Sequence, residues 1–460
     1  MARPRKNAVK AQNSLLTPDK VAEVPVEEQP YPLPEGWKGG RGNSLWKSQE
    51  TEKPTGNFFY YIDIDAVDNK QQKVISPKQT PVSQAPSRAS RKLHEGDTIF
   101  SLVRPYLRNI AYIDEDISNC IASTGFYICS PLKNVNSRFL YWLMTSDYVV
   151  LGLNKFMKGD NSPSIRKNDI ENFPFPLPTL DEQQRIVDRI EFLFAKLDEA
   201  KAKAEAVLDG FEIRKAAILH KAFTGELTAK WREENGIEND SWKEKDFAYI
   251  IRNIKAGKNL RCEERPPQEN EIGIVKVSAV TWGFFNELES KTCIDPSVYN
   301  KNIQIKKGDF LFSRANTIQL IGNCVIVENI HKKLILSDKI LRLEINKNIS
   351  NKYILYFSMS TKYRKQITSL ASGNQDGMRN ISQKNLLKIK IPLPTEEEQQ
   401  GIVRILDNLL AKEQQAKEAA ETVLHQINLM KKAILARAFR GELGTHIPSQ
   451  INPQRTEACI

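Results

Sequence analysis

The chain has 460 residues, of which 40% are hydrophobic and 27% are charged, and its formal net charge is +11. This composition is typical of globular proteins and predicts two to four domains, which excludes collagen-like, wholly disordered and disulfide-scaffold proteins. The excess of positive charge favours a polyanionic partner, because each basic side chain near a phosphate releases condensed counterions.

The chain carries no sign of export or membrane insertion. No apolar stretch approaches the roughly 20 residues that cross a bilayer, and the segment Met1–Lys20 lacks the apolar core of a secretion signal. The six cysteines are scattered, with no CxxC pair and no histidine at ligand spacing. We therefore expect a cytoplasmic protein with reduced, structural thiols.

Changes in composition divide the chain into six segments. The first is polar and rich in Pro, Gln and Glu, which predicts a disordered tail. It is followed by a first mixed α/β globule, a central helix, a second mixed α/β globule, a C-terminal helix and a final tail. The predicted bounds, in that order, are 1–33, 34–178, 179–230, 231–394, 395–443 and 444–460.

The two globules contain short β-rich runs between turn residues. Within the first, Gly39–Asn57 looks like a loop, and this globule is shorter near its start than the second. We expect either that it lacks an element or that the two starts align differently. The strands predicted in the two globules are Thr98–Val103, Phe126–Cys129, Ile272–Val277, Phe310–Phe312 and Asn323–Val327.

A block of residues that follows each globule occurs twice without a gap. A match of this length indicates one rigid element used two times. The matched pairs, in chain order, are Pro176–Thr179 with Pro392–Thr395, Glu182–Gln184 with Glu398–Gln400, Ile186–Val187 with Ile402–Val403, and Gly225–Leu227 with Gly441–Leu443.

Each copy of the block predicts a long helix. Thr179 and Thr395 can cap the amide three residues later, where a Glu can reach back, and Gly225 and Gly441 suit a left-handed C-terminal cap. A helix from Leu180 to about residue 224 would be roughly 65 Å long.

Apolar residues in both helices recur at alternating spacings of four and three, which is a heptad seam. We predict that the two helices form an intramolecular coiled coil; each could instead pack on its own globule or dimerise between chains. The seam residues are Ile186, Ile190, Leu193, Leu197, Ala200, Ala204 and Val207, then Ile402, Leu406, Leu409, Ala416, Ala420 and Val423, with Glu413 interrupting the second run.

The sequence lacks the common catalytic motifs. It has no GxxxxGK[ST] phosphate loop, no GxGxxG after a strand, no HExxH, no GxSxG and no Asn-Pro-Pro-aromatic tetrapeptide. The acidic pair Asp63 and Asp65 fits the wet face of a strand.

Polar and basic runs in the globules predict DNA contacts. Residues 352–390 carry many Lys and Arg against Asp376 alone, and Ser372–Arg379 offers side chains that match base edges. A polar surface loop remains the alternative. The candidate DNA-binding residues are Arg104, Arg108, Lys158, Asn161, Ser164 and Arg166 in the first globule, and Arg314, Asn316, Gln319, Lys362, Arg364, Lys365, Asn374, Gln375 and Arg379 in the second.

With its repeated blocks, each following a dissimilar globule, the chain resembles the specificity subunit (HsdS type) of type I restriction–modification enzymes. Thr224–Arg232 is especially similar to that family. The resemblance implies an α+β fold with two target-recognition domains, separated by two long antiparallel helices in a pseudo-twofold repeat. Each domain would read one half of a split target in double-stranded DNA, and the helices would fix the spacer between the halves.

The resemblance also implies that the chain is not an enzyme. It would bind no metal and no cofactor, and its helices would hold two modification subunits that transfer methyl groups from S-adenosylmethionine to adenine. Two restriction subunits would add Mg- and ATP-dependent translocation and cleavage. Two alternatives remain: a self-contained nuclease that binds Mg²⁺ through Asp63 and Asp65, and a coiled-coil adaptor that binds only proteins.

Overall fold

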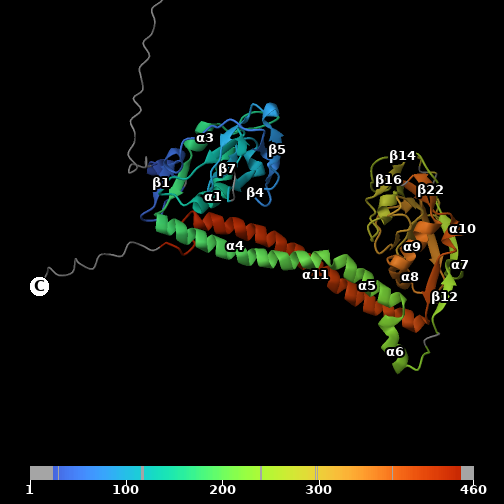
Figure 1. The fold of residues 1–460 in the computed structure, drawn as a ribbon. Coiled ribbons are helices and arrows are strands. Elements are labelled where there is room, and N and C mark those ends of the chain that lie inside the picture. Colours follow the sequence, from blue (N-terminus) through green and yellow to red (C-terminus); the bar gives the residue numbers. More distant parts are fainter. Residues whose placement is uncertain are drawn as a thin grey trace, which may run out of the picture. The chain divides into compact units, whose positions relative to one another are not determined.

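The computed structural model describes residues 24–29, 31–114, 119–238, 241–295, 297, 299–375 and 377–446, without the side chains of Asn374 and Gln375. The chain divides into two compact units. Unit 1 comprises Met1–Lys203 with Val423–Ile460, and unit 2 comprises Ala204–Thr422. The division falls inside the two long helices, α4 (Leu180–Asp209) and α11 (Glu396–Ala438) (Figure 1).

Unit 1 combines several small sheets with helices, as predicted for a mixed α/β globule. The sheets run β1-β11, β10-β7-β8, β5-β2-β9-β6 and β3-β4. Its elements are β1 (Lys38–Arg41), β2 (Phe58–Ile62), β3 (Val67–Asp68), β4 (Lys73–Val74), β5 (Lys78–Pro81), β6 (Ala89–Lys92), β7 (Thr98–Ser101), β8 (Ile110–Tyr112), β9 (Cys120–Ser123), β10 (Phe126–Cys129), α1 (Ser137–Thr145), α2 (Asp147–Asn154), α3 (Lys167–Glu171) and β11 (Pro174–Leu177).

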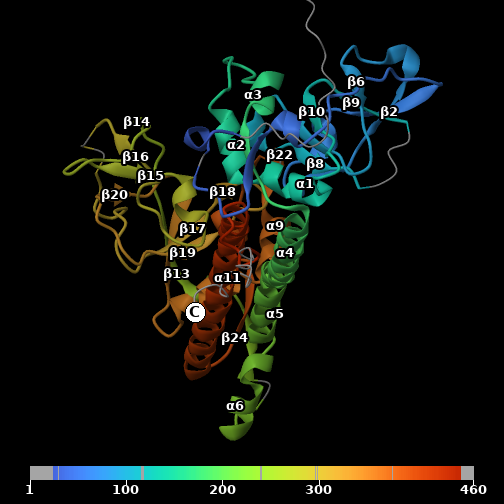
Figure 2. The same ribbon diagram turned by 90° about the vertical axis from the view of Figure 1, so that its left-hand side faces the viewer.

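Unit 2 has a similar order of elements, and its sheets run β12-β24, β13-β21-β17-β19, β14-β16-β15-β20 and β18-β23-β22 (Figure 2). Its elements are α5 (Phe211–Phe223), α6 (Ala229–Glu234), β12 (Lys243–Asp246), α7 (Phe247–Ile250), β13 (Ile251–Ala256), β14 (Cys262–Glu263), β15 (Gly273–Val275), β16 (Ser290–Cys293), β17 (Phe310–Ser313), β18 (Ala315–Asn316), β19 (Cys324–Ile326), β20 (Leu334–Ile335), β21 (Ile340–Ile345), α8 (Asn351–Ser358), α9 (Thr361–Leu370), β22 (Ser372–Gln375), β23 (Met378–Asn380), α10 (Gln383–Leu386) and β24 (Lys390–Leu393).

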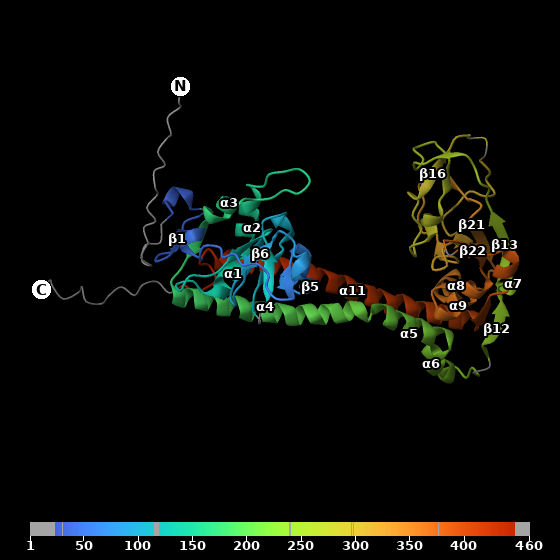
Figure 3. The ribbon, with the colours of Figure 1, turned by 45° about the horizontal axis from the view of Figure 1, so that its top comes forward.

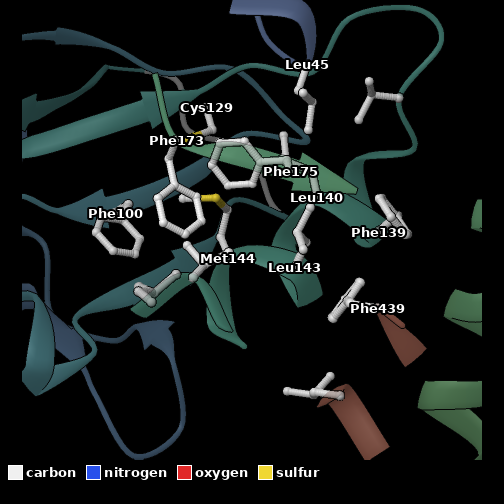
Figure 4. Close-up of a cluster of buried hydrophobic side chains, with 14 of the residues drawn as sticks. Leu45, Phe100, Cys129, Phe139, Leu140, Leu143, Met144, Phe173, Phe175 and Phe439 are labelled. Carbon is white, nitrogen blue, oxygen red and sulfur yellow. The ribbon is translucent and has the colours of Figure 1, made fainter. Parts of the chain in front are cut away.

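The core of each unit joins its globule to its part of the long helices. In unit 1, Phe439 just beyond α11 packs edge-on against Phe139 of α1, near the buried Phe173 and Phe175 (Figure 4). In unit 2, Phe223 at the end of α5 packs edge-on against Phe357 of α8. Figure 3 shows these two helices side by side. Burial of such large aromatic side chains stabilises the contact between helix and globule.

The repeated glutamine next to the buried Glu ties each long helix to its globule. The side-chain oxygen of Gln183 accepts from the backbone N–H of Asn136, which caps α1, at 2.7 Å. The side-chain oxygen of Gln399 accepts from the backbone N–H of Ser350, which caps α8, at 3.0 Å. Both glutamines are buried, so this part of the repeat serves packing.

Glu398 forms a buried polar hub in unit 2 with residues that follow the first copy of the repeated block. Its Oε1 atom accepts from Arg232 Nη1 at 2.5 Å and from Thr228 Oγ1 at 2.5 Å, and its Oε2 atom accepts from Trp242 Nε1 at 3.0 Å. Arg232 also donates to the carbonyl of Gly225. The amide of Glu398 donates to Thr395 Oγ1 as expected, but its carboxylate serves the hub and does not reach back to the cap.

The long helices pair antiparallel within each unit. In unit 1, Lys431 of α11 donates to Asp198 of α4 at 2.6 Å. In unit 2, Arg214 of α5 donates to Glu413 of α11 at 2.8 Å, which explains the break in the seam, because the charged Glu413 has a cation opposite it. The central helix is divided at Gly210, where α4 ends and α5 begins, so it is not one uninterrupted helix.

The predicted seam holds in α4 and shifts in α11. All its predicted positions in α4 are buried or half-buried, whereas Ala416 and Val423 of α11 are exposed. Lys417 and Leu424, one position later, are half-buried, and Lys417 lies over the ring of Phe211. Spacings of three-then-four and of four-then-three both pass through Glu413, Ala420 and Ile427 and differ only in the position between them. The sequence pattern therefore did not distinguish Ala416 from Lys417, or Val423 from Leu424.

The start of the first globule differs from its expected loop. Residues 38–41 form strand β1, which pairs with β11 as β12 pairs with β24 in unit 2. Among the residues of unit 1 that the structure describes, no strand corresponds to β13, and Trp46 and Thr51 make isolated bridges there. Within the predicted tail 1–33, Val24 is buried and donates to the Gly39 carbonyl.

The structure also describes the two predicted glycine caps and most of the cysteines. Gly225 and Gly441 have the predicted left-handed conformation, with φ of +83° and +72°. Five cysteines are free thiols, Cys459 lies outside the described residues, and burial raises the pKa of Cys324 to about 11. In the part of the chain that the structure describes, no helix is long and apolar enough to cross a membrane.

Candidate nucleic-acid interface

Two polar runs that are distant in the sequence of unit 2 meet in one small sheet. Strand β18 pairs with β23, and β23 pairs with β22, so that Asn316 lies opposite Arg379 in the antiparallel register. The backbone carbonyl of Arg314 accepts from the amide of Ile381, which extends this pairing. The structure thus brings together two groups of residues that the sequence predicted separately as DNA-contacting.

The candidate base-reading residue Arg379 is held by its own hairpin. Its Nη1 atom donates to the carbonyl of Gly373 at 2.6 Å. Gly373 has φ of +131°, and a Cβ there would lie 2.9 Å from the carbonyl oxygen of Met378, so the turn requires glycine. Asn374 and Gln375 belong to β22, but their side chains lie outside the described part of the structure.

The remaining candidates of unit 2 differ in their surroundings. The guanidinium of Arg364 donates to the carbonyl of Ile321 and to Asn323 Oδ1, so it holds a loop in place. Lys362 forms an ion pair with Glu244 at 3.0 Å. Lys365 and Gln319 are exposed. Of these four, the exposed pair is the most available for a phosphate or a base.

Carboxylates from other segments offset part of the positive charge of the basic stretch 352–390 in the folded chain. Lys352 pairs with Asp407 at 3.0 Å, and Lys390 lies 3.8 Å from Glu244, which also pairs with Lys362. These carboxylates come from segments outside the stretch, so a count along the sequence did not include them.

Unit 1 places its candidates in a similar arrangement. Arg104 follows β7 and donates from Nη2 to the carbonyl of Asn161 at 2.7 Å. Ser164 makes isolated bridges with both Val103 and Lys158. The segment after β7 therefore pairs with the Lys158–Ser164 loop, as β18 after β17 pairs with the β22–β23 hairpin.

Two other candidates of unit 1 have structural partners. The guanidinium of Arg108 forms an ion pair with Asp147 at the start of α2 and donates to the carbonyl of Thr145 at the end of α1. The backbone amide of Arg166 donates to Asp169 at 2.7 Å and starts α3, while its side chain is exposed. A DNA contact by Arg108 stays a prediction, although both of its Nη atoms already bind partners inside the domain.

Each unit has a hollow beside its candidate residues. The hollow in unit 1, of about 680 Å³, is lined by Asp68, Arg104 and Asn109 among others. The hollow in unit 2, of about 650 Å³, is lined by Thr281 and Asn323 among others. Thr281 and Asn323 were not predicted from the sequence, although Asn323 directly precedes β19 as Asn109 directly precedes β8.

The acidic pair considered for a nuclease lies beside a lysine. Asp63 and Asp65 stand at a short 3₁₀ turn after β2, not on a strand face, and Lys78 lies 2.9 Å and 3.7 Å from their carboxylates. Among the residues that the structure describes, no group of His, Cys, Asp and Glu is arranged to hold a metal ion.

Comparison with known proteins gives consistent matches. The model of the type I restriction modification DNA specificity domain matches twice, over residues 41–208 and 238–422. The EcoKI specificity subunit of Escherichia coli K12 is 27% identical over 322 residues, covering 69% of this chain and 68% of that protein. The EcoDI specificity subunit of Escherichia coli is 24% identical over 406 residues, covering 83% and 85%.

Two solved structures are similar over most of the chain. The HsdS subunit from Thermoanaerobacter tengcongensis is 26% identical, with a TM-score of 0.64, and the match covers 91% of this chain and all of that one. A chain from a structure that addresses complex assembly and conformational transition of the type I R-M system is 26% identical, with a TM-score of 0.72 and 90% of this chain covered. The predicted α+β fold class, with two domains and long helices, is confirmed.

Proposed function

Because the chain belongs to the family of DNA specificity subunits of type I restriction–modification systems, non-catalytic components that target DNA, we propose that each globular domain reads one half of a bipartite target. The observation that carries the proposal is the double match of the specificity-domain model, once over each globule. The pairing of Asn316 with Arg379, and of Val103 with Ser164, supports a similar mode of reading in both domains.

The long helices set the number of unread base pairs between the two half-sites. Supporting this, the helices pair antiparallel in both units, through Asp198 with Lys431 and through Arg214 with Glu413. A helix pair with an apolar seam resists bending and sliding, so its length determines a distance.

The same helices dock two copies of a methyltransferase subunit. Ile213 and Leu429 occupy the same position in the two copies of the repeat and are 73% and 52% exposed. Large apolar side chains facing solvent at equivalent positions favour two copies of one partner.

The remaining partners and cofactors follow from this role. S-adenosylmethionine, Mg and ATP are used by the modification and restriction subunits, of which two restriction subunits complete the complex. This chain holds no cofactor of its own and acts on DNA in the cytoplasm. The nuclease and the protein-only adaptor are not favoured, since Asp63 and Asp65 engage Lys78 and the family targets DNA.

Arg379→Ala tests the reading role of the β18-β23-β22 sheet. We expect it to relax discrimination at one base pair of one half-site by about 1–3 kcal/mol, because a forked donor to a base edge is lost. Lys365→Ala, the matched control, should weaken binding to all sequences similarly and lower the salt dependence. Binding of the assembled methyltransferase complex to a panel of singly substituted duplexes measures both.

An Arg379→Ala complex with the affinity and sequence preference of the wild type would remove this sheet from the reading surface. A uniform loss over the whole panel would assign Arg379 to phosphate contact or to folding of the hairpin through its bond to Gly373.

A further inference from the structure

Unit 2 carries two aromatic side chains on an exposed but well-anchored loop. Trp282 is 66% exposed and Phe284 is 60% exposed. Directly after them the chain is anchored, because Phe285 packs against the buried cluster behind β17 and the amide of Asn286 donates to the carbonyl of Ala279 at 3.0 Å. The loop therefore presents both aromatic side chains to solvent from a constrained backbone.

Hydrogen bonds connect this loop to the candidate reading residues. The carbonyl of Thr281, next to Trp282, accepts from Asn323 Nδ2 at 2.8 Å. The hydroxyl oxygen of Thr281 lies 3.5 Å from Asn316 Nδ2, and Asn316 stands opposite Arg379 in the β18–β23 pair. The loop that carries the exposed aromatic side chains is thus connected through Thr281 to a residue of the β18-β23-β22 sheet.

The hollow beside this loop carries charges that suit a polyanion. The hollow of about 650 Å³ is lined by Trp282 together with two basic side chains, Lys215 and Arg364, and one acidic side chain, Glu212. The acidic residues that follow the loop are engaged elsewhere: Glu287 accepts from the amides of His331 and Lys332. A phosphate backbone crossing this hollow would meet more positive than negative charge.

The first domain does not share the aromatic loop. After Ala66-Val67 the chain reads Asp68-Asn69-Lys70-Gln71, where unit 2 has Thr281-Trp282-Gly283-Phe284 after Ala279-Val280. Asp68 there accepts from the amides of Lys70 and Gln71, which gives a polar turn. Because the loop lies beside the candidate reading residues, we expect the two domains to contact their half-sites differently.

We propose that the Trp282–Phe284 loop contacts duplex DNA at the half-site read by the second domain, with both aromatic side chains packed on base faces at a locally unstacked step. This inference rests on the proposed function. Aromatic rings gain free energy on any base face, and apolar wedges between base pairs let a protein favour steps that deform easily. The second half-site therefore acquires a preference for a deformable step that the first half-site lacks.

The experiment uses the full chain assembled with its methyltransferase subunits, on a duplex containing its target. 2-Aminopurine is placed at positions in and beside the second half-site other than the methylated adenine, and its fluorescence reports unstacking. The variants are Trp282→Ala, Phe284→Ala and the double variant. Trp282→Phe serves as the conservative replacement, and Ile294→Ala, whose side chain is 61% exposed elsewhere in unit 2, is the matched control.

We expect each alanine variant to weaken target binding by roughly tenfold and to lower the 2-aminopurine signal, because stacking on a base is lost. The salt dependence should not change, since no charge is removed. Trp282→Phe should retain most of the affinity, and Ile294→Ala all of it.

Two results would overturn the inference. One is wild-type affinity and fluorescence in the double variant. The other is failure of the variants to assemble with the methyltransferase subunits, which would assign the loop to a protein partner. If the wild-type complex itself shows no sequence-specific binding, the proposed function fails, and that outcome is distinct from both.

Discussion

Glu398→Ala is expected to lower the free energy of unfolding of unit 2 by about 3–5 kcal/mol, because it leaves the buried Arg232 guanidinium without its carboxylate. The side chains of Glu398 and Arg232 are 0% and 6% exposed. The same substitution removes the acceptors for Thr228 and Trp242. Hydrogen exchange of the full chain measures the change, because amides of unit 1 serve as an internal reference.

Two matched variants separate the hub from a general effect of losing a Glu. Glu182→Ala, at the equivalent position of unit 1, should cost about 1 kcal/mol, since the partner that the structure describes for Glu182 is the His446 ring at 3.1 Å, whereas Glu398 faces a buried arginine. Glu397→Ala, next to the hub and exposed, should change stability by less than about 0.5 kcal/mol. Equal losses in Glu398→Ala and Glu397→Ala would contradict the role of the hub.

Removal of one heptad from each long helix is expected to shorten the spacer in the DNA target by about three base pairs. The deletion takes Leu197–Lys203 from α4 and His425–Lys431 from α11, two segments joined in unit 1 by the Asp198–Lys431 pair. Seven residues rise about 10 Å along a helix, and base pairs stack about 3.4 Å apart. Whole heptads keep the seam in register. Mapping methylated adenines gives the new spacer.

The half-sites themselves should be unchanged in this variant, because both domains are untouched. Deletion of only one of the two segments is the control, and it should reduce assembly or stability, since the facing seams no longer match. An unchanged spacer after the paired deletion would remove the helices from the role of setting the distance.

Much of the architecture could be predicted from the sequence because it depends on local patterns. The exact repeat of Pro176–Thr179 in Pro392–Thr395 identified the two long helices, and the strand Phe126–Cys129 was predicted with its observed bounds. Those features follow from periodicity, caps and turn residues, which act over a few positions.

Features that depend on distant partners could not be predicted in this way. Glu413 looked like a defect in the seam, and only the fold shows Arg214 opposite it. The repeated Glu398 was read as a cap, yet its carboxylate meets Arg232 and Trp242. Similar reasoning applies to the candidate interface: residue types suggested Arg379 and Asn316 separately, whereas their pairing depends on the β18–β23 register.

The most direct test of the account is a map of methylated adenines in DNA treated with this chain and its methyltransferase subunits. The account predicts two short specified sequences separated by a constant number of unspecified base pairs, with methylation in both parts. Replacing residues 238–422 with the corresponding domain of a relative should then change only one of the two parts. A single uninterrupted recognition sequence, or a change in both parts after that exchange, would contradict it.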